Sequence, residues 1–289
     1  MAEPTRQVEA GRRRPTRIGS GNGPLFRIVV ALGALVVVAA AVLPLWYMVV
    51  LSLDPDPVGN ATGLVPRRLS LDSYRLLSSP AFGFYPALSR SLVLSVTTTA
   101  ASLLVAAPAA YALGRLRVPG AAPVLAVLLT MAFFPGVVVV VPLSETFSAI
   151  GWLDRLWGIG FAQLSYTVPL AVWFLTYAFR AVPREVEEAA LMDGATTRQR
   201  LLRVVLPIAR PGVAGTTALV FVASWNDFLF SAAFSRSSRS ETLPVVLAKL
   251  PEIGFLGGQM AAGVLMCLPV ATVVAALLAW LSHRDRPTR

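Results

Sequence analysis

Six continuous apolar stretches, each long enough to cross a lipid bilayer, constrain what this 289-residue chain can fold into. A membrane-spanning helix needs roughly 20 consecutive apolar residues. The stretches run over Ile28–Leu53, Leu88–Leu113, Ala121–Val141, Ile159–Phe179, Gly212–Ala232 and Gly257–Leu281. A backbone in lipid must satisfy its own hydrogen bonds, and a barrel would show alternating residues. The sequence therefore predicts an all-α membrane protein with six transmembrane helices.

The composition agrees with lipid as the solvent. Hydrophobic residues make up 56% of the chain and charged residues 14%, whereas about 25% of a soluble domain is charged. Five prolines fall inside the apolar stretches, and we interpret them as kinks: Pro44, Pro108, Pro135, Pro169 and Pro269.

The distribution of basic residues predicts the orientation. Six spans place both termini on one side, and the connections on that side carry seventeen basic residues against eight on the other. The seventeen are Arg6, Arg12, Arg13, Arg14, Arg17, Arg27, Arg115, Arg117, Arg180, Arg184, Arg198, Arg200, Arg203, Arg210, Arg284, Arg286 and Arg289. Cytoplasmic loops carry the excess of Lys and Arg, so we expect both termini in the cytoplasm. The net charge of +10 then reflects topology and anionic lipid, and not nucleic-acid binding.

The expected organisation follows from these spans. Residues 1–27 are a disordered, basic cytoplasmic segment, and residues 28–53 are the first transmembrane helix. Residues 54–87 form an extracytoplasmic loop, residues 88–281 the main transmembrane domain, and residues 282–289 a short cytoplasmic tail.

Motifs for catalysis or metal binding are absent from the sequence. It contains no G-x-x-x-x-G-K-[ST], H-E-x-x-H or G-x-S-x-G motif, so we expect no catalytic residues and no ATP hydrolysis by this chain. Cys267 and His283 are the one cysteine and the one histidine, and we expect no metal site. Asp227 is the one ionisable residue well inside a span, which disfavours an ion-coupled transporter.

The connection from Arg180 to Pro207 has the local chemistry of two short helices. Pro183 suits a helix start, and the following glutamates favour the positive end of the helix dipole. Gly194 suits the left-handed residue that ends a helix. Thr196 and Gln199 form a capping box for a second helix, which we expect Pro207 and Pro211 to end.

This predicted helix pair presents small residues and exposed glutamates on the cytoplasmic face. Ala189 and Ala190 would let another protein approach closely, and the glutamates could pair with its arginines. Local chemistry leaves two interpretations open, a docking surface or an amphipathic loop that lies on the membrane.

The same segment resembles the EAA loop of permeases from binding-protein-dependent ATP-binding-cassette (ABC) importers. That pattern reads E-A-A, three residues, G, nine residues and I-x-L-P. The matching residues here are Glu188-Ala189-Ala190, Gly194 and Val204-Val205-Leu206-Pro207, with valine in place of isoleucine.

Further segments resemble the sugar-uptake branch, and in particular its maltose-permease-like second subunit. They are Ala110–Arg117, Phe134-Pro135 with Pro142-Leu143, and Ser224–Phe228; the resemblance covers roughly residues 85–281. Relatives commonly continue past the last span to a Gly-Ala-Val-Lys-Gly-like tail. The sequence here reads Ser282–Arg289 instead, so we expect any ATPase contact of that tail to be missing or different.

The resemblance implies a mechanism and a set of partners. This chain and a second permease subunit would form the pore, two cytoplasmic ATP-binding subunits would use ATP and Mg, and an extracytoplasmic solute-binding protein would deliver the solute. The chain itself would bind no cofactor and would be a multi-pass protein of the bacterial inner membrane. The residues implied in ATPase docking are Glu187, Glu188, Ala189, Ala190, Asp193, Gly194, Leu206 and Pro207.

Three other functions stay open at this point. An ABC permease for an amino acid, phosphate or glycerol phosphate is the closest alternative to sugar uptake. A secondary transporter is disfavoured by the scarcity of ionisable groups, and a membrane-embedded enzyme by the lack of catalytic pairs.

Trp225, Asn226 and Asp227 in the fifth span are candidate residues of the substrate pathway. The indole could stack on a sugar ring, and the two polar side chains could bond hydroxyl groups. The structural alternative, which we favour, is a hydrogen-bond cluster between helices or an interfacial anchor.

Overall fold

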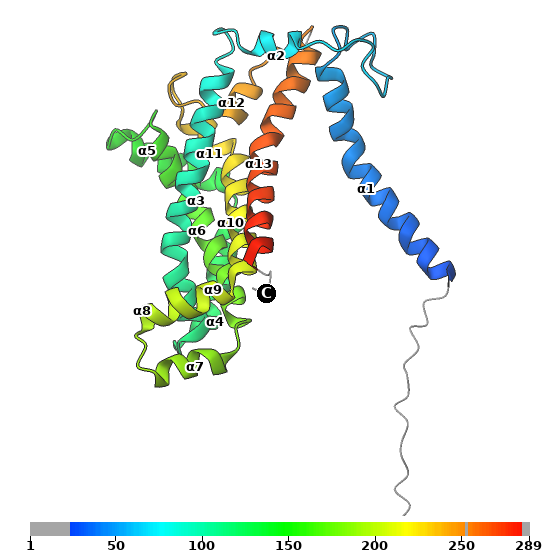
Figure 1. The fold of residues 1–289 in the computed structure, drawn as a ribbon. Coiled ribbons are helices and arrows are strands. Elements are labelled where there is room, and N and C mark those ends of the chain that lie inside the picture. The colour runs from blue at the N-terminus through cyan, green and yellow to red at the C-terminus, as the bar shows by residue number, and fades with distance from the viewer. Residues whose placement is uncertain (1–23, 252–253, 285–289) are drawn as a thin grey trace, which may run out of the picture. The chain divides into compact units, whose positions relative to one another are not determined.

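The computed structural model describes residues 24–251 and 254–284 and consists of helices and connecting segments, with no strand among these residues. It divides into two units, Met1–Trp46 and Tyr47–Arg289 (Figure 1). The described part of the first unit is residues 24–46 of the apolar helix α1 (Pro24–Ser52). Residues 47–52 of this helix belong to the second unit. The segment expected to be disordered lies, up to residue 23, outside the described residues, as do residues 285–289 of the expected tail.

Four helices are long and apolar enough to cross a membrane, or up to six spans exist if each of two bent pairs counts as one. The four are α1, α3 (Phe84–Arg115), α6 (Leu156–Arg180) and α13 (Leu256–Arg284). The bent pairs are α4 (Ala121–Ala132) with α5 (Gly136–Ala149), at 83°, and the segment Thr197–Ile208 with α10 (Arg210–Trp225), at 84°. The prediction of an all-helical membrane protein is confirmed at this level.

Two of the predicted spans are not continuous helices. The stretch Ala121–Val141 bends sharply at Pro135, which precedes α5. The twelve residues of α4 reach about 18 Å at 1.5 Å per residue, less than the ~30 Å of a bilayer core. The stretch Gly212–Ala232 breaks after Trp225, and α11 (Leu229–Phe234) begins beyond the break. The Asp227 carboxylate accepts hydrogen bonds from the backbone N–H groups of Phe230 and Ser231, which starts the new helix.

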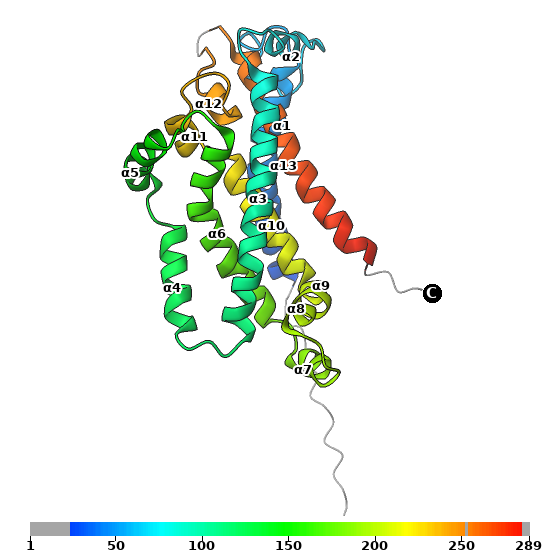
Figure 2. The same ribbon diagram turned by 90° about the vertical axis from the view of Figure 1, so that its left-hand side faces the viewer.

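The core of the second unit lies where α3 and α6 pack side by side, with α10 against both (Figure 2). Buried alanines such as Ala106, Ala110 and Ala171 let the backbones approach closely. A Cβ atom added at Gly114 would lie 3.2 Å from the Thr176 carbonyl oxygen, a tight contact that favours glycine here. Pro108 and Pro169 are accommodated inside these helices.

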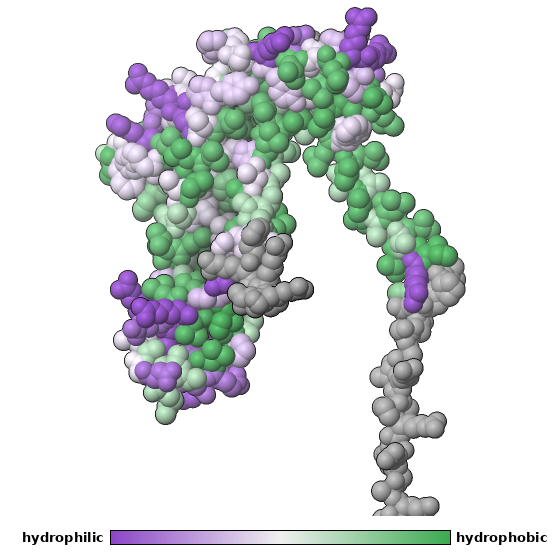
Figure 3. Space-filling view, in the orientation of Figure 1, coloured by the Kyte–Doolittle hydropathy of each residue, from purple (hydrophilic) through white to green (hydrophobic). Residues whose placement is uncertain are grey.

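Polar residues gather at the two ends of the second unit. On the face shown in Figure 3, hydrophilic residues lie at both ends and hydrophobic residues between them. One end holds α2 (Asp72–Leu77) and α12 (Leu243–Leu247) with the connections before α6 and after α11. The other holds α7 (Arg184–Met192), α8 (Thr197–Gln199), the π-helix η1 (Arg200–Val205) and α9 (Leu206–Ile208).

Asp154 joins the two connections at the α2 end. Its carboxylate accepts hydrogen bonds from the hydroxyl groups of Ser237 and Ser240 and from the backbone N–H groups of Arg236 and Ser237. The two hydroxyl groups contribute most to holding the pKa of this carboxyl well below its usual range. Its φ of 58° is in the left-handed region, where Asp is better tolerated than most residues.

Candidate functional site

The segment from α7 to α9 folds largely as its local chemistry predicts. Pro183 precedes α7, whose first turn contains Glu185 and Glu187. The helix ends at Met192, Gly194 just beyond it has a φ of 79°, and the N–H of Ala195 donates to the Ala190 carbonyl oxygen at 2.9 Å. The predicted helix start and left-handed glycine are therefore confirmed.

The second helix of the segment also begins where predicted. Gln199 N–H donates to Thr196 Oγ1 at 3.3 Å, and Thr196 N–H donates to Gln199 Oε1 at 2.8 Å, which completes the capping box. The helix continues through η1 to Ile208 and bends by 84° at Ala209, so the break expected from Pro207 and Pro211 lies between these two prolines. A π-helical turn shifts the backbone hydrogen bonds by one residue, so one carbonyl loses its usual N–H partner. Proline fits at such a turn because it has no N–H to donate.

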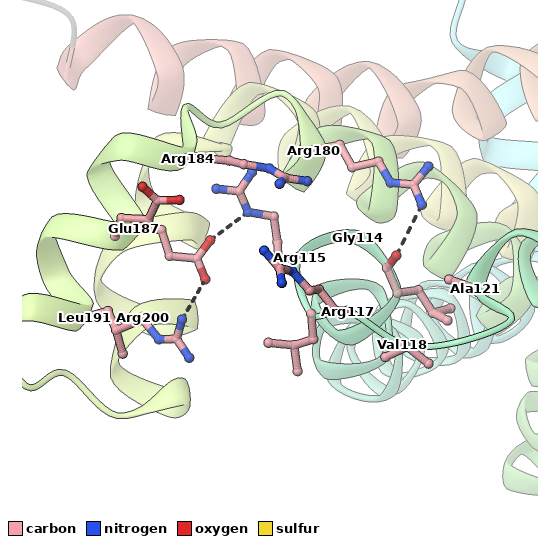
Figure 4. Close-up of a pocket in the computed structure, with 13 residues that line it drawn as sticks. Gly114, Arg115, Arg117, Val118, Ala121, Arg180, Arg184, Glu187, Leu191 and Arg200 are labelled. Carbon is pink, nitrogen blue, oxygen red and sulfur yellow. Dashed lines mark hydrogen bonds and ion pairs between the residues drawn. The ribbon is translucent and has the colours of Figure 1, made fainter.

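Glu187 lies at the centre of a buried polar network that links α7 to α3 and η1. Arg115 Nε donates to its Oε2 at 2.7 Å, and Arg200 Nη1 donates to its Oε1 at 3.3 Å, from opposite sides (Figure 4). The Tyr111 hydroxyl also donates to Oε1. Arg115 further donates through Nη1 to the Val182 carbonyl oxygen at 2.8 Å. The last turn of α3 therefore holds both the start of α7 and its central carboxylate.

The pKa of Glu187 shows which effect dominates in this network. Burial by itself raises the pKa of the carboxyl, but the Tyr111 hydrogen bond and the two guanidinium groups outweigh burial and lower it. The side chain is therefore ionised at neutral pH and carries a charge that Arg115 and Arg200 compensate.

Glu187 is a correction to the predicted set of exposed glutamates. It is buried and paired within the chain, whereas Glu188 and Glu185 are exposed on the same helix. The spacing of the EAA pattern does not show which of two adjacent glutamates faces inward. The rotation of α7 is set by its contact with α3, which lies 72 residues earlier in the sequence.

The other predicted docking residues fall into two groups. Glu188, Ala189, Asp193 and Gly194 are exposed, and Ala190 is half-buried. Glu188 lies with Arg184 and Leu191 on the side of α7 that faces the ends of α3 and α6. Leu206 and Pro207 are half-buried in α9, where Leu206 packs against the core cluster that contains Val205 and Phe179. They therefore support the segment from inside.

The structure separates the three candidate residues of the substrate pathway. Trp225 is 1% exposed, stacks on Phe221 and donates through Nε1 to the Met266 carbonyl oxygen at 3.2 Å. Its ring is therefore closed to a sugar in this conformation. Asn226 is exposed at the end of α10. Asp227 lies beyond the helix end, so the expectation that both polar residues share a helix is wrong.

Asp227 belongs to a hydrogen-bond cluster between α6, α10 and α11. Its Oδ2 atom accepts from Gln163 Nε2 at 3.0 Å and from both the backbone N–H and the hydroxyl of Ser231 at 3.1 Å. Gln163 Oε1 in turn accepts from the Ser224 hydroxyl at 2.6 Å. The carboxylate thus has protein donors.

Sequence reasoning missed several residues that position these sites. Arg115 and Arg200 were interpreted through their charge as topology markers, and Tyr111 and Gln163 were not singled out. One signal was available: Tyr111 and Arg115 are four residues apart, so both project from one face of the last turns of α3 toward a common partner. The partner itself could not be identified without the tertiary contact.

Comparisons with known proteins extend these observations. Residues 106–286 match the family described as the inner membrane component of binding-protein-dependent transport systems. The chain is 31% identical to the trehalose/maltose transport system permease MalG of Thermococcus litoralis, over 88% of this chain and 92% of that protein. It is 32% identical to the trehalose transport system permease SugB of Mycobacterium tuberculosis, over 82% and 88%.

A solved structure agrees with the fold. A chain from the crystal structure of a bacterial ABC transporter that imports the acidic polysaccharide alginate superposes with a TM-score of 0.70 and 25% identity. The match covers 90% of this chain and 98% of that one.

Fold and matches together define a multi-pass inner-membrane permease of the ABC importer class. The chain belongs to the family of inner membrane components of binding-protein-dependent transport systems. The predicted family is confirmed, and in this family the permease subunit is not itself the ATPase.

Proposed function

We propose that this chain is one of two permease subunits of an importer for a sugar or oligosaccharide. The observation that carries the proposal is similarity over most of the chain to permeases named for trehalose and maltose. The partners are a second permease, two ATP-binding subunits that use ATP and Mg, and a solute-binding protein. The chain itself holds no cofactor in this scheme.

The α7 segment is the proposed contact with the ATPase. The segment offers the exposed Glu188 carboxylate for pairing, the small side chains of Ala189 and Ala190, and the turn at Gly194. Exposure of these residues supports docking, since a partner can reach them without unfolding the helix. In this orientation the α7 end is cytoplasmic, which agrees with its content of basic residues.

The Glu187 network gives the docked segment a physical link to the transmembrane helices. A displacement of α7 moves Glu187, and Glu187 is held by Arg115 at the end of α3. Separating α7 from α3 would leave a buried charge unpaired, which is strongly unfavourable, so α3 follows α7. Movement imposed by the ATPase is thereby transmitted to the pore.

Uptake measurements test the substrate class. Cells that lack this chain should lose uptake of labelled trehalose or maltose and regain it when the chain is restored. Amino-acid, phosphate and glycerol-phosphate uptake should be unchanged. Loss of one of these with normal sugar uptake would contradict the sugar assignment and leave the ABC permease family intact. Calorimetry of the cognate solute-binding protein against a panel of sugars would then identify the sugar.

A further inference from the structure

A cavity of about 570 Å³ opens beside α7, and its lining is strongly basic. The ends of α3 and α6, the start of α4 and one side of α7 enclose it (Figure 4). Two glutamates, Glu187 and Glu188, face five arginines there: Arg115, Arg117, Arg180, Arg184 and Arg200. The lining therefore carries an excess of three positive charges.

The charge excess is not compensated within the described part of the chain. Glu187 is already shared between Arg115 and Arg200. The side chains of Arg117 and Arg184 are exposed and make no ion pair or hydrogen bond with other described residues. Arg200 Nε is buried and has no hydrogen-bond partner among those residues. Guanidinium groups that line one cavity repel one another, and a bound anion would reduce this repulsion.

The position of the cavity relative to the ends of the apolar helices indicates which kind of anion it could bind. Arg115 and Arg180 are the last residues of two apolar helices, and Ala121 is the first residue of α4, so the cavity lies at the depth of lipid headgroups. No side chain caps the N-terminus of α4, whose N–H groups also favour an anion. Leu113, Val118 and Ala121 add apolar surface to the same lining.

We propose that this cavity binds the phosphate headgroup of an anionic phospholipid. Arg117 and Arg184 contact the phosphate directly, while Arg115 and Arg200 remain engaged with Glu187. Basic pockets between membrane helices bind such headgroups on general electrostatic grounds. A lipid bound here lies against the side of α7 that carries Glu187, Glu188 and Leu191 and steadies the docking segment. The lipid assignment does not depend on the solute that the transporter carries.

Native mass spectrometry of the purified, assembled transporter tests the proposal. Phosphatidylglycerol should bind in preference to phosphatidylcholine of the same chain length. The double variant Arg117→Gln/Arg184→Gln should lose roughly 10-fold or more of that affinity. Neither side chain has an internal partner in the described residues, so the fold should survive. Arg203→Gln removes an exposed arginine of the same segment that does not line the cavity and should bind like the wild type.

Four results would overturn the lipid assignment. The first is equal affinity for the two lipids in the wild type. The second is unchanged phosphatidylglycerol binding in the double variant. The third is binding of inorganic phosphate to lipid-stripped transporter, lost in the double variant, without lipid binding, which would assign the cavity to a free anion. Loss of the ATPase subunit from the double variant with lipid binding intact would assign these arginines to the protein interface instead.

Discussion

The Glu187 carboxylate accepts hydrogen bonds from three side chains on two other helices. They are Tyr111 and Arg115 on α3 and Arg200 on η1. Its neighbour Glu188 is exposed and has no comparable contacts among the described residues. Two adjacent residues of one motif thus have different tasks, one internal and one at the surface. The internal task can be tested separately from docking.

Replacing Glu187 with glutamine should weaken the attachment of α7. The amide is close in shape but leaves Arg115 and Arg200 without a counter-charge, at a cost of roughly 1–3 kcal/mol. We expect less ATPase to co-purify and slower uptake per complex. Glu185→Gln is the matched control, because Glu185 is exposed on the same helix. Equal loss in both variants would count against a special role for the buried carboxylate.

The hydrogen-bond network around Glu187 predicts that the attachment of α7 depends on pH. The folded-state pKa of Glu187 is lowered relative to its unfolded value of about 4.3. Its contribution to stability is therefore fully present above that value and is lost as pH falls through the folded pKa. A spin label at Glu185→Cys, in a Cys267→Ser background, should become more mobile on acidification. In the Glu187→Gln variant its mobility should be high throughout, and a label at exposed Leu104→Cys on α3 should not respond.

Substitutions at Gly194 test the backbone conformation of the turn separately from side-chain packing. A Cβ atom at this position would meet nothing within 4 Å, so the obstacle to substitution is the φ of 79° alone. Gly194→Val should strain the turn by at least 1–2 kcal/mol and reduce ATPase co-purification and uptake. Gly194→Asn should retain most of both, because asparagine tolerates this region. Wild-type behaviour of the valine variant would argue that the turn is not part of the docking contact.

At the scale of elements, the break between α10 and α11 is fixed by side-chain hydrogen bonds. Asp227 accepts from Gln163 on α6 and from the first turn of α11, and so joins three helices at one point. The α4–α5 bend of 83° lies next to this region, since Gly136 at the start of α5 is close to Leu229 and Phe230 of α11. Both breaks therefore lie against side chains from outside their own segments.

Two substitutions distinguish a structural Asp227 from a substrate-binding one. Asp227→Asn can keep an oxygen at the Oδ2 position and so retain the bonds from Gln163 and Ser231. We expect near-normal uptake from it. Asp227→Leu removes every acceptor and leaves Gln163 Nε2 unpaired, which costs about 1–3 kcal/mol and should lower the amount of assembled complex. A large rise in the Km of Asp227→Asn, with normal abundance, would instead favour a substrate contact.

At the scale of the whole molecule, charged connections mark the two ends of the second unit. The α7 end carries arginines in both of its described connections, residues 116–120 and 181–209. The α2 end is organised around Asp154 and the ion pair of Lys249 with Glu241. The α2 end also carries arginines, and the proposed cytoplasmic orientation of α7 rests on the larger number of basic residues that the sequence places on its side, seventeen against eight.

Cysteine labelling in intact cells tests that orientation. In a Cys267→Ser background, an impermeant thiol reagent should not label Arg198→Cys in the α7 segment. It should label Arg239→Cys, which is exposed at the α2 end. Permeabilised cells should label both, which shows that each site is accessible. The opposite pattern in intact cells would reverse the proposed topology.

The sequence by itself determined the class of protein and the local structure of the segment from α7 to α9. Continuous apolar runs require helices because lipid offers the backbone no hydrogen-bond partners. Pro183, Gly194 and the Thr196–Gln199 capping box act over a few residues, so they could be read without tertiary information.

Only the tertiary structure decided how those pieces are joined. Pro135 signalled a kink, but the 83° size of the bend is given only by the structure. The α10 break depends on Gln163, 64 residues away from Asp227, and the inward turn of Glu187 depends on Arg115, 72 residues away. Local patterns fix the backbone of each segment, whereas the burial of a charge is decided by which partner the fold brings within hydrogen-bond distance.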